Sequence, residues 1–288
     1  MVVTYTEWSF KICLSLLYTI VYKLSEAIFC RLWSRKGDWI FSSNLFMIMS
    51  ELTAQRQRMR ILMWMAVLVF AATAGSAQDK PVVVVELFTS QGCSSCPPAD
   101  ALLDRLSSRN NVLALSFHVD YWDYIGWKDK FASPAHTARQ QAYARAAGRR
   151  SVYTPQMIIN GLDDVAGTAP MDVADMIDRH SRRQPVVELA LRQSPNKVRV
   201  EVKPLRKIGP SVLQVAYIST HEVVEIKRGE NAGRKLQYTN VVKRIDRLRK
   251  WSGAAPLTVE IALKQHEQAV LLIQQEGHGA IHSAVLLR

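Results

Sequence analysis

Two cysteines separated by two residues are the side chains in this sequence best suited to do chemistry. Cys93 and Cys96 stand directly before Pro97-Pro98, a pair that suits the opening of a helix. Cysteines at this spacing can close a small disulfide ring, and the free N–H groups and dipole of a helix N-terminus stabilise the first thiolate. Such a thiolate attacks other disulfides and is also a good leaving group. The spacing therefore predicts thiol–disulfide exchange, with Cys93 as the nucleophile and Cys96 as the resolving thiol.

Other uses of the same cysteine pair stay open. A zinc site would need two further strong ligands, usually a second CxxC or an HxxxH pattern, whereas His118 and His136 are isolated in the sequence. The pair could instead form an inert structural disulfide, which exported proteins use. His118 could also join the two thiolates in a copper site, because thiolates favour Cu(I). We expect no metal, and no cofactor other than the redox-active disulfide itself.

Two residues near the pair favour redox chemistry. Pro155 stands at the start of the strand-like run 156–159, where a proline needs a positional reason. A cis peptide there would place a backbone edge beside the cysteines, and a trans proline at a strand start is the alternative. Glu86 lies inside the apolar run 82–88, and buried near the cysteines it could pass a proton to or from Cys96. A carboxylate at the rim of the sheet is the other interpretation of Glu86.

The elements that position these residues follow from the apolar patterning. Strands rich in β-branched residues alternate with helices, an order that argues for an α/β layer fold in residues 78–184. After Pro185 the pattern changes to short strands separated by turn residues, which predicts a small all-β sandwich over residues 185–288. The expected elements are strands at 82–88, 112–119 and 157–159, helices from 97, over 133–148 and over 171–183, and strands at 186–191, 198–200, 212–218, 241–245, 257–263 and 269–274.

The segment 59–77 has the three parts of a secretory signal. Arginines cluster around its start, an uncharged and mostly apolar run covers 61–74, and Gly75-Ser76-Ala77 places small residues where a signal peptidase cuts. The apolar run is too short to span a bilayer comfortably as a permanent helix. We expect residues 1–58 to reflect a start assigned too early, with a membrane-anchoring extension as the alternative. The mature protein is predicted to be periplasmic or secreted, with membrane contact only through the signal segment.

Composition sets the outer bounds on function. The 288 residues are 48% hydrophobic and 22% charged, which excludes a disordered, collagen-like or polytopic membrane protein. Four cysteines are too few for a disulfide scaffold, and removal of the signal leaves only the pair at 93 and 96 in an oxidising compartment. The net charge of +12 includes a basic run at 243–250 and a basic loop at 228–235. We interpret the loop at 228–235 as a hairpin loop with solvated charges. Export argues against a nucleic-acid partner, so we expect protein or small-molecule thiols and disulfides as partners.

Four segments carry a resemblance to a known family: VVELFTSQGCSSCPPAD, HVDYWDYIGWKD, YTPQMIING and RGENAGRKLQYTNVV. In their order of strands, helices and motifs they resemble the thioredoxin fold. More closely, residues 81–288 are similar to a bacterial family of secreted thioredoxin-like proteins, domain-of-unknown-function family 1223. The resemblance implies that Cys93 is the attacking thiol, Cys96 the resolving thiol, and Pro155 a cis substrate-docking proline preceded by Thr154. It implies no particular activity, because the family is uncharacterised.

The resemblance extends to an aromatic segment after the second strand. In thioredoxin topology the end of that strand lies at the same sheet edge as the cysteines, so His118, Trp122 and Trp127 could form a binding rim for a peptide or small ligand. Rings that cap the core are the alternative. Two departures stand out: Gln91-Gly92 replaces the tryptophan-bearing approach of thioredoxin, and Glu86 lies one residue farther from the first cysteine than thioredoxin's buried acid. The uncharged Ser-Ser dipeptide leaves the direction of electron flow open.

Overall fold

The computed structural model describes residues 81–287. The expected early start at 1–58 and the expected secretory signal at 59–77 lie outside the described residues. Within the described range, no helix is both long enough and apolar enough to cross a membrane.

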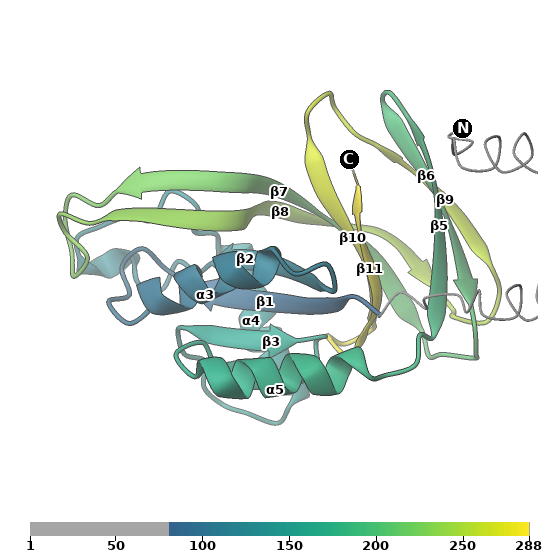
Figure 1. The fold of residues 1–288 in the computed structure, drawn as a ribbon, viewed down its shortest axis with the longest axis horizontal. Helices are drawn as coiled ribbons and strands as arrows, with labels where there is room; N and C mark the ends of the chain where they lie inside the picture. The colour runs from purple at the N-terminus through teal and green to yellow at the C-terminus, as the bar shows by residue number, and fades with distance from the viewer. Residues whose placement is uncertain (1–80, 288) are drawn as a thin grey trace, which may run out of the picture. The chain divides into compact units, whose positions relative to one another are not determined.

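A mixed eight-stranded sheet contains the first strands of the described chain (Figure 1). β1 (Val83–Thr89) runs parallel to β2 (Val112–His118) and antiparallel to β3 (Gln156–Ile159). β1 is buried along its whole length, as its near-continuous apolar run predicts. β4 (Asp163–Ala166) follows β3 through Asn160-Gly161, where both residues have the positive φ that a tight hairpin turn requires. The other strands of the sheet are β7 (Ser211–Glu225), β8 (Lys235–Trp251), β10 (Gln268–Gln275) and β11 (Ile281–Leu287), in the order β11-β10-β7-β8-β2-β1-β3-β4.

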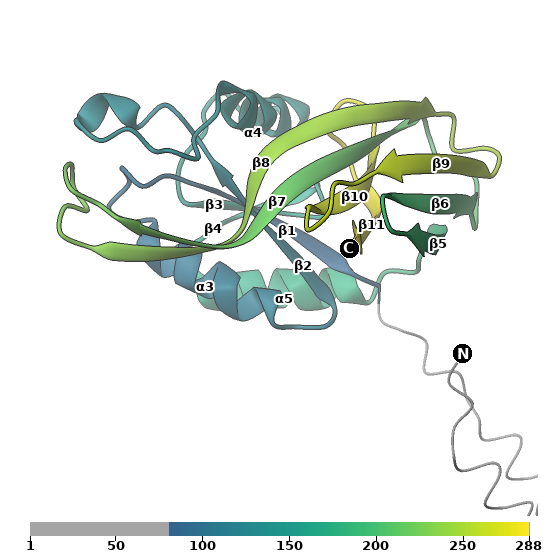
Figure 2. The ribbon, with the colours of Figure 1, turned by 90° about the horizontal axis from the view of Figure 1, so that it is seen from above.

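Helices cover both faces of the sheet around β1 (Figure 2), namely α3 (Pro97–Ser107), α4 (Pro134–Ala146) and α5 (Pro170–Ser181). Each begins with a proline in its first turn, where the missing N–H costs no helical hydrogen bond. Strand side chains alternate between faces. Val85 and Leu87 therefore pack with residues of α3 and α5, whereas Val84 and Phe88 pack on the opposite face with Tyr143 of α4. This alternation decides which buried polar side chains can meet.

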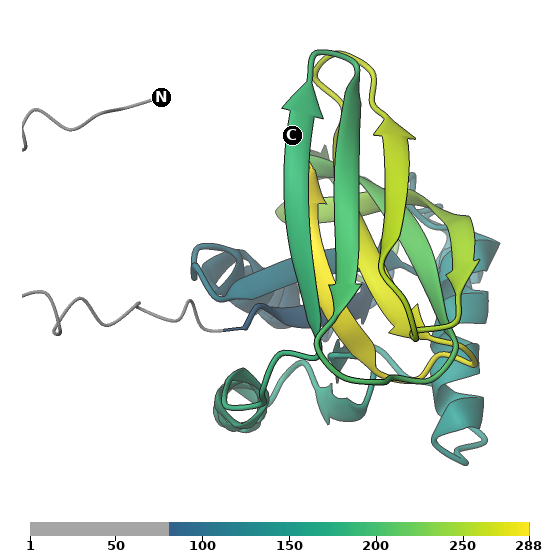
Figure 3. The same cartoon turned by 90° about the vertical axis from the view of Figure 1, so that its right-hand side faces the viewer.

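A second sheet of three strands packs over the C-terminal part of the first (Figure 3), in the order β5 (Val187–Ser194), β6 (Lys197–Pro204) and β9 (Leu257–Ala262). Val198 and Val200 of β6 share a core with Leu213 of β7 and Leu271 of β10. A sandwich is thus present, but one of its layers is the eight-stranded sheet. This differs from the separate β-domain expected after residue 184. Residues 81–287 form one compact unit, because β8 pairs with β2 and joins the two halves of the sheet.

The β7–β8 hairpin is longer than the sequence predicted, with 15 residues in β7 and 17 in β8. Its outer half runs beside α3, where the Thr239 hydroxyl donates a hydrogen bond to the Asp104 carboxylate (Figures 1 and 2). Val224 and Leu236 form a small core there with Phe131. The hairpin therefore carries its tip, residues 226–234, toward the start of α3.

Candidate functional site

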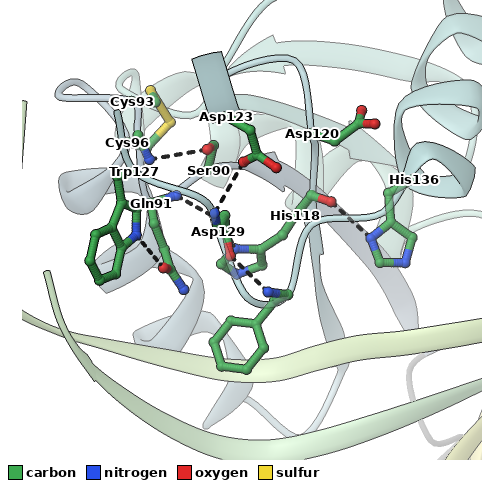
Figure 4. Close-up of polar contacts among 12 residues, drawn as sticks. Ser90, Gln91, Cys93, Cys96, His118, Asp120, Asp123, Trp127, Asp129 and His136 are labelled. Atoms are coloured by element: carbon green, nitrogen blue, oxygen red, sulfur yellow. Dashed lines mark hydrogen bonds and ion pairs between the residues drawn. A yellow bond between two sulfur atoms is a disulfide. The ribbon is translucent and has the colours of Figure 1, made fainter. Parts of the chain in front are cut away.

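The Cys93–Cys96 disulfide lies between the end of β1 and the start of α3 (Figure 4). The two Cα atoms are 5.4 Å apart, and Cys96 is the N-cap residue of α3. The Ser95 hydroxyl lies 3.4 Å from Cys93 Sγ and is the donor, because a disulfide sulfur carries no proton. Both cysteines are 0% exposed, whereas Ser94 and Ser95 between them face solvent. The disulfide is therefore formed at a helix N-terminus and shielded from solvent.

Two segments distant in sequence are hydrogen-bonded to the loop that carries the disulfide. Asn231 in the hairpin tip (residues 226–234) donates from Nδ2 to the carbonyls of Gln91 and Cys93, at 2.9 Å each. Trp127 donates from Nε1 to Gln91 Oε1 at 2.8 Å. The basic loop expected to be solvated does expose most of its residues, but Asn231 turns inward and is buried against the cysteine loop.

The predicted docking proline also lies at this end of the sheet. The Thr154–Pro155 peptide is cis, and the Thr154 hydroxyl accepts a hydrogen bond from Trp122 Nε1 at 2.8 Å. A Cβ atom at Gly167 would lie 2.8 Å from Ala99 Cβ and 3.1 Å from Pro155 Cβ. Only glycine fits between them, so Pro155 is held close to the first turn of α3. Trp122 and Trp127 are half-buried.

His118, at the end of β2, is hydrogen-bonded to a buried carboxylate (Figure 4). Its Nδ1 lies 2.6 Å from Asp129 Oδ2, and Asp129 also accepts the backbone N–H groups of Gln91 at 2.8 Å and Phe131 at 2.9 Å. Burial alone would raise the pKa of Asp129, but the His118 charge and these hydrogen bonds outweigh burial and lower it. Asp129 is therefore ionised, and His118 Nδ1–H is the donor.

His118 also belongs to a group of four buried polar side chains, which we call the polar cluster under α3. Its other members are Thr89, Asp100 and Tyr238. Thr89 and His118 are paired residues of β1 and β2, and the His118 and Tyr238 ring centroids are 4.7 Å apart. Thr89 Oγ1, both Asp100 carboxyl oxygens, His118 Nε2 and the Tyr238 hydroxyl have no hydrogen-bond partner among residues 81–287. Buried polar groups are nearly always hydrogen-bonded to protein or water, so this group of atoms marks the α3 side of the sheet as the candidate site.

Asp100 connects the cluster to the disulfide. It follows Cys96 by one helical turn, and its backbone N–H donates to the Cys96 carbonyl at 3.1 Å. Burial raises the pKa of the Asp100 carboxyl to about 7, while the charge of His118 opposes this rise and that of Asp129 adds to it. A carboxyl that gains and loses its proton near neutral pH therefore stands one turn away from Cys96.

Glu86, for which we weighed proton transfer to Cys96 against a carboxylate at the rim of the sheet, lies on the opposite face of β1 from α3. Its Oε1 is 2.7 Å from Arg139 Nη2, and the Tyr143 hydroxyl donates to its other oxygen. Arg139 donates further hydrogen bonds to Gln214 at 3.1 Å and Gln274 at 3.2 Å. The carboxylate charge is thus paired in a buried network on the α4 face, whereas α3 covers the other face. The structure does not bring Glu86 to the cysteines, because strand alternation directs its side chain away from them.

The other predicted site residues lie near the disulfide, some of them through intermediates. Pro155 is near the first turn of α3, Trp122 reaches Thr154, Trp127 reaches the cysteine loop through Gln91, and His118 lies under α3.

For the copper alternative, His118 Nδ1 is already bonded to Asp129, and within residues 81–287 no three His, Cys, Asp or Glu side chains gather as metal ligands.

Sequence reasoning missed Asp100, Asp129 and Asn231 as site residues. Helical spacing could have found Asp100, which falls one turn after Cys96 and three residues before the buried Leu103. Asn231 has no comparable local signal, because its contact depends on how a hairpin some 140 residues away docks on the cysteine loop.

Comparison with known proteins agrees with the resemblance at the level of the family. The crystal structure of protein AGR_C_4864 from Agrobacterium tumefaciens is 35% identical, with a TM-score of 0.64 over 73% of this chain and 96% of that one. HBP35 of Porphyromonas gingivalis shares the fold at 14% identity, with a TM-score of 0.50 over 72% of this chain and 75% of that one. No curated protein matches. The model of a family described as "Protein of unknown function (DUF1223)" matches residues 84–274, and the chain therefore belongs to the DUF1223 family.

Proposed function

We propose that this protein is a thiol–disulfide oxidoreductase whose Cys93–Cys96 disulfide exchanges with thiols of protein or small-molecule substrates. A thioredoxin-like arrangement of residues 81–184 is part of the proposal, and the order β1-α3-β2-α4-β3-β4-α5 supports it, with the cysteines at the start of α3. The secretory pattern at 59–77 supports action in the periplasm or outside the cell, where protein disulfides persist.

The observation that carries this proposal is the buried Asp100 carboxyl one turn after Cys96. A structural disulfide needs no ionisable group beside it, and a buried carboxyl without hydrogen-bond partners in the described chain is costly. Groups with strongly shifted pKa values concentrate at functional sites. A pKa of about 7 lets Asp100 act as either proton donor or proton acceptor near neutral pH.

The exchange begins when a substrate thiolate attacks Cys93 Sγ. The Cys93–Cys96 bond breaks, a substrate–Cys93 disulfide forms, and the electron pair leaves on Cys96 Sγ, which takes a proton from the Asp100 carboxyl. A second substrate thiolate then attacks the substrate sulfur of the mixed disulfide, so that the substrate leaves as a disulfide and Cys93 as a thiolate. The N-terminus of α3 and the Ser95 hydroxyl stabilise that thiolate. The same steps in reverse reduce a substrate disulfide.

Substrate docking is assigned to the edge formed by Thr154, Pro155, Trp122 and Trp127. Pro155 lies near the first turn of α3, and the two half-buried indoles are hydrogen-bonded to Thr154 and to Gln91 of the cysteine loop. Aromatic rings with one polar atom suit a rim that contacts both apolar and peptide groups. Asn231 completes the enclosure from the hairpin side.

The variant Cys96→Ser tests the proposal with oxidised glutathione as the probe. Cys93 is expected to attack it and release one glutathione, and because no resolving thiol remains, the Cys93–glutathione disulfide should accumulate as a gain in mass. The matched variant Cys93→Ser, which retains only Cys96, should gain mass much more slowly. Equal reaction of both variants, or a Cys96→Ser protein that stays a free thiol, would contradict the proposal.

A second candidate function is favoured by the complete burial of both cysteines. It is a non-catalytic, thioredoxin-like binding module for a partner protein or copper, in which the disulfide is only structural. This candidate predicts that neither cysteine variant reacts with oxidised glutathione in the native state. It also predicts that the disulfide is reduced only when the whole protein unfolds.

A further inference from the structure

We propose that the hairpin tip, residues 226–234, is a gate over the disulfide, that Asn231 is its latch, and that thiols reach Cys93 only when the tip withdraws. The inference rests on the proposed exchange at Cys93–Cys96 and concerns its regulation. It starts from a conflict within the site: a disulfide proposed to react with substrates is fully buried.

Asn231 is the residue of the tip that is tied to the cysteine loop. Its side chain is 1% exposed, and its single amide group donates to the carbonyls of both Gln91 and Cys93. Its own Oδ1 accepts a hydrogen bond from Arg234 at 2.9 Å, which orients the amide. Asn231 is thus a positioning residue, since its hydrogen bonds hold the backbone around Cys93.

Residues 227–230 and 232–234 of the tip face solvent, and backbone hydrogen bonds close the tip on itself. The N–H of Ile226 donates to the Arg234 carbonyl at 2.9 Å, and the N–H of Gly233 donates to the Ile226 carbonyl at 2.8 Å. Gly229, with φ of 78°, lies against Trp127, where a Cβ would approach Trp127 Cβ to 3.3 Å. The residues on either side of Asn231 are exposed.

Opening therefore leaves the folded body of the hairpin intact. The apolar contacts that anchor it, including Val224, Leu236 and Tyr238, lie outside the tip, and Ile226, the first residue of the tip, packs with them and stays in place as the hinge. Withdrawal of the tip breaks the two Asn231 bonds and the Gly229 contact, and the tip keeps its own backbone hydrogen bonds. Local openings of this kind occur well below the free energy of global unfolding.

A matched pair of variants tests the gate. Asn231→Asp replaces the donating amide with a carboxylate that repels the two carbonyls, while the partner Arg234 is retained. Asn240→Asp removes an equivalent bond elsewhere in the same hairpin, from Asn240 Nδ2 to the Ala114 carbonyl at 3.0 Å. Asp tolerates the positive φ of residue 240, so the control introduces little backbone strain.

The readout is the rate at which dithiothreitol reduces the Cys93–Cys96 disulfide in native buffer, with dithiothreitol itself oxidised to its cyclic disulfide. Loss of two hydrogen bonds should speed reduction of Asn231→Asp by about tenfold or more, and Asn240→Asp should stay within about twofold of the parent. An unchanged rate for Asn231→Asp, or equal acceleration in both variants, would overturn the gate.

A second measurement on the unmodified protein covers the case in which Asn231→Asp fails to fold. The logarithm of the reduction rate at low urea should be nearly flat, because opening the tip exposes little surface. A rate that climbs with the full slope of global unfolding would also overturn the gate. If the gate results hold but Cys96→Ser traps no mixed disulfide, the gate stands and the proposed function fails. If Cys96→Ser traps the mixed disulfide but Asn231→Asp is reduced at the parent rate, the proposed function stands and the gate is wrong.

Discussion

Glu86 and Asp100 are both carboxyl groups buried beside the same region of the sheet, and they lie on opposite faces in opposite electrostatic settings. Glu86 is 0% exposed and bound by Arg139 and Tyr143 on the α4 face. Asp100 is 6% exposed on the α3 face, and its oxygens lack a hydrogen-bond partner in the part of the chain that the structure describes. Burial raises the pKa of the Asp100 carboxyl to about 7, whereas Glu86 is paired with the buried Arg139 guanidinium.

The difference separates structural from chemical use of a buried acid. In the Glu86 network the polar groups are hydrogen-bonded to one another, so removing one side chain leaves another buried group without its partner. The network therefore fixes the packing of α4 on the sheet. An unsaturated acid weakens the fold but remains free to exchange a proton with a neighbour. Cys96 precedes Asp100 by one helical turn, and its carbonyl accepts the backbone N–H of Asp100.

The largest expected effect is a loss of stability in the hydrogen-bonded network around Glu86. Arg139→Met would leave the Glu86 charge buried without its cation, and we expect the free energy of unfolding to fall by about 3–5 kcal/mol. Urea denaturation measures this. The double variant Glu86→Leu with Arg139→Met should recover most of the loss, because no unpaired charge remains. A loss below about 1 kcal/mol for Arg139→Met would show that the network is not structural.

Asp100→Asn should instead increase the stability of the protein above neutral pH. The native pKa of about 7 lies above the ordinary value of 3.8, so between these pH values the native state holds a proton that the unfolded state has lost. The free energy of unfolding therefore falls as pH rises through this window. The contribution of the protonated Asp100 carboxyl is fully present below about pH 4 and is lost as pH passes 7. Asn cannot ionise, so at pH 8 we expect the variant to be more stable than the parent by roughly 4 kcal/mol, since each unit of the pKa difference is worth about 1.4 kcal/mol. Unfolding at pH 8 and pH 4 measures the gap, which should close at the lower pH.

Two tyrosines sharpen the comparison with a smaller effect. The Tyr143 hydroxyl is bonded to Glu86, Arg139 and Gln274, whereas the Tyr238 hydroxyl has no partner within residues 81–287. Tyr143→Phe should therefore cost about 1–3 kcal/mol, and Tyr238→Phe should be neutral or stabilise by up to about 1 kcal/mol. Thermal unfolding of the two variants side by side checks this, and a similar loss in both would mean that the two faces do not differ.

The local elements could be predicted from sequence more completely than the contacts between them. Apolar runs and turn residues indicated β1, β2 and β3, but β11 was missed, and β4, with the sequence Asp-Asp-Val-Ala, carries little strand signal. The union of the two halves in one sheet depends on pairing of Ser116 with Val241, a long-range contact with no local signature.

The candidate site divides in the same way. The cysteine pair and the proline at 155 could be recognised from spacing and order, because those features are local. Alternation along β1 groups Glu86 with Val84 and Phe88, but only the fold shows that α4, and not α3, covers that face. Asn231 needed the tertiary structure for the same reason, since the hairpin that carries it docks from far along the chain.

The most direct test of the account compares Asp100→Asn with Glu86→Gln in the reduction of Cys93–Cys96 by dithiothreitol at pH 7. The reductant is kept in the range where the rate is proportional to its concentration, and the temperature is chosen so that both variants are folded. We predict that Asp100→Asn is slower by about 100-fold, the usual contribution of a positioned acid, and that Glu86→Gln stays within about threefold of the parent. A parent-like rate in Asp100→Asn, or a slow rate only in Glu86→Gln, would contradict the assignment of the site to the α3 face.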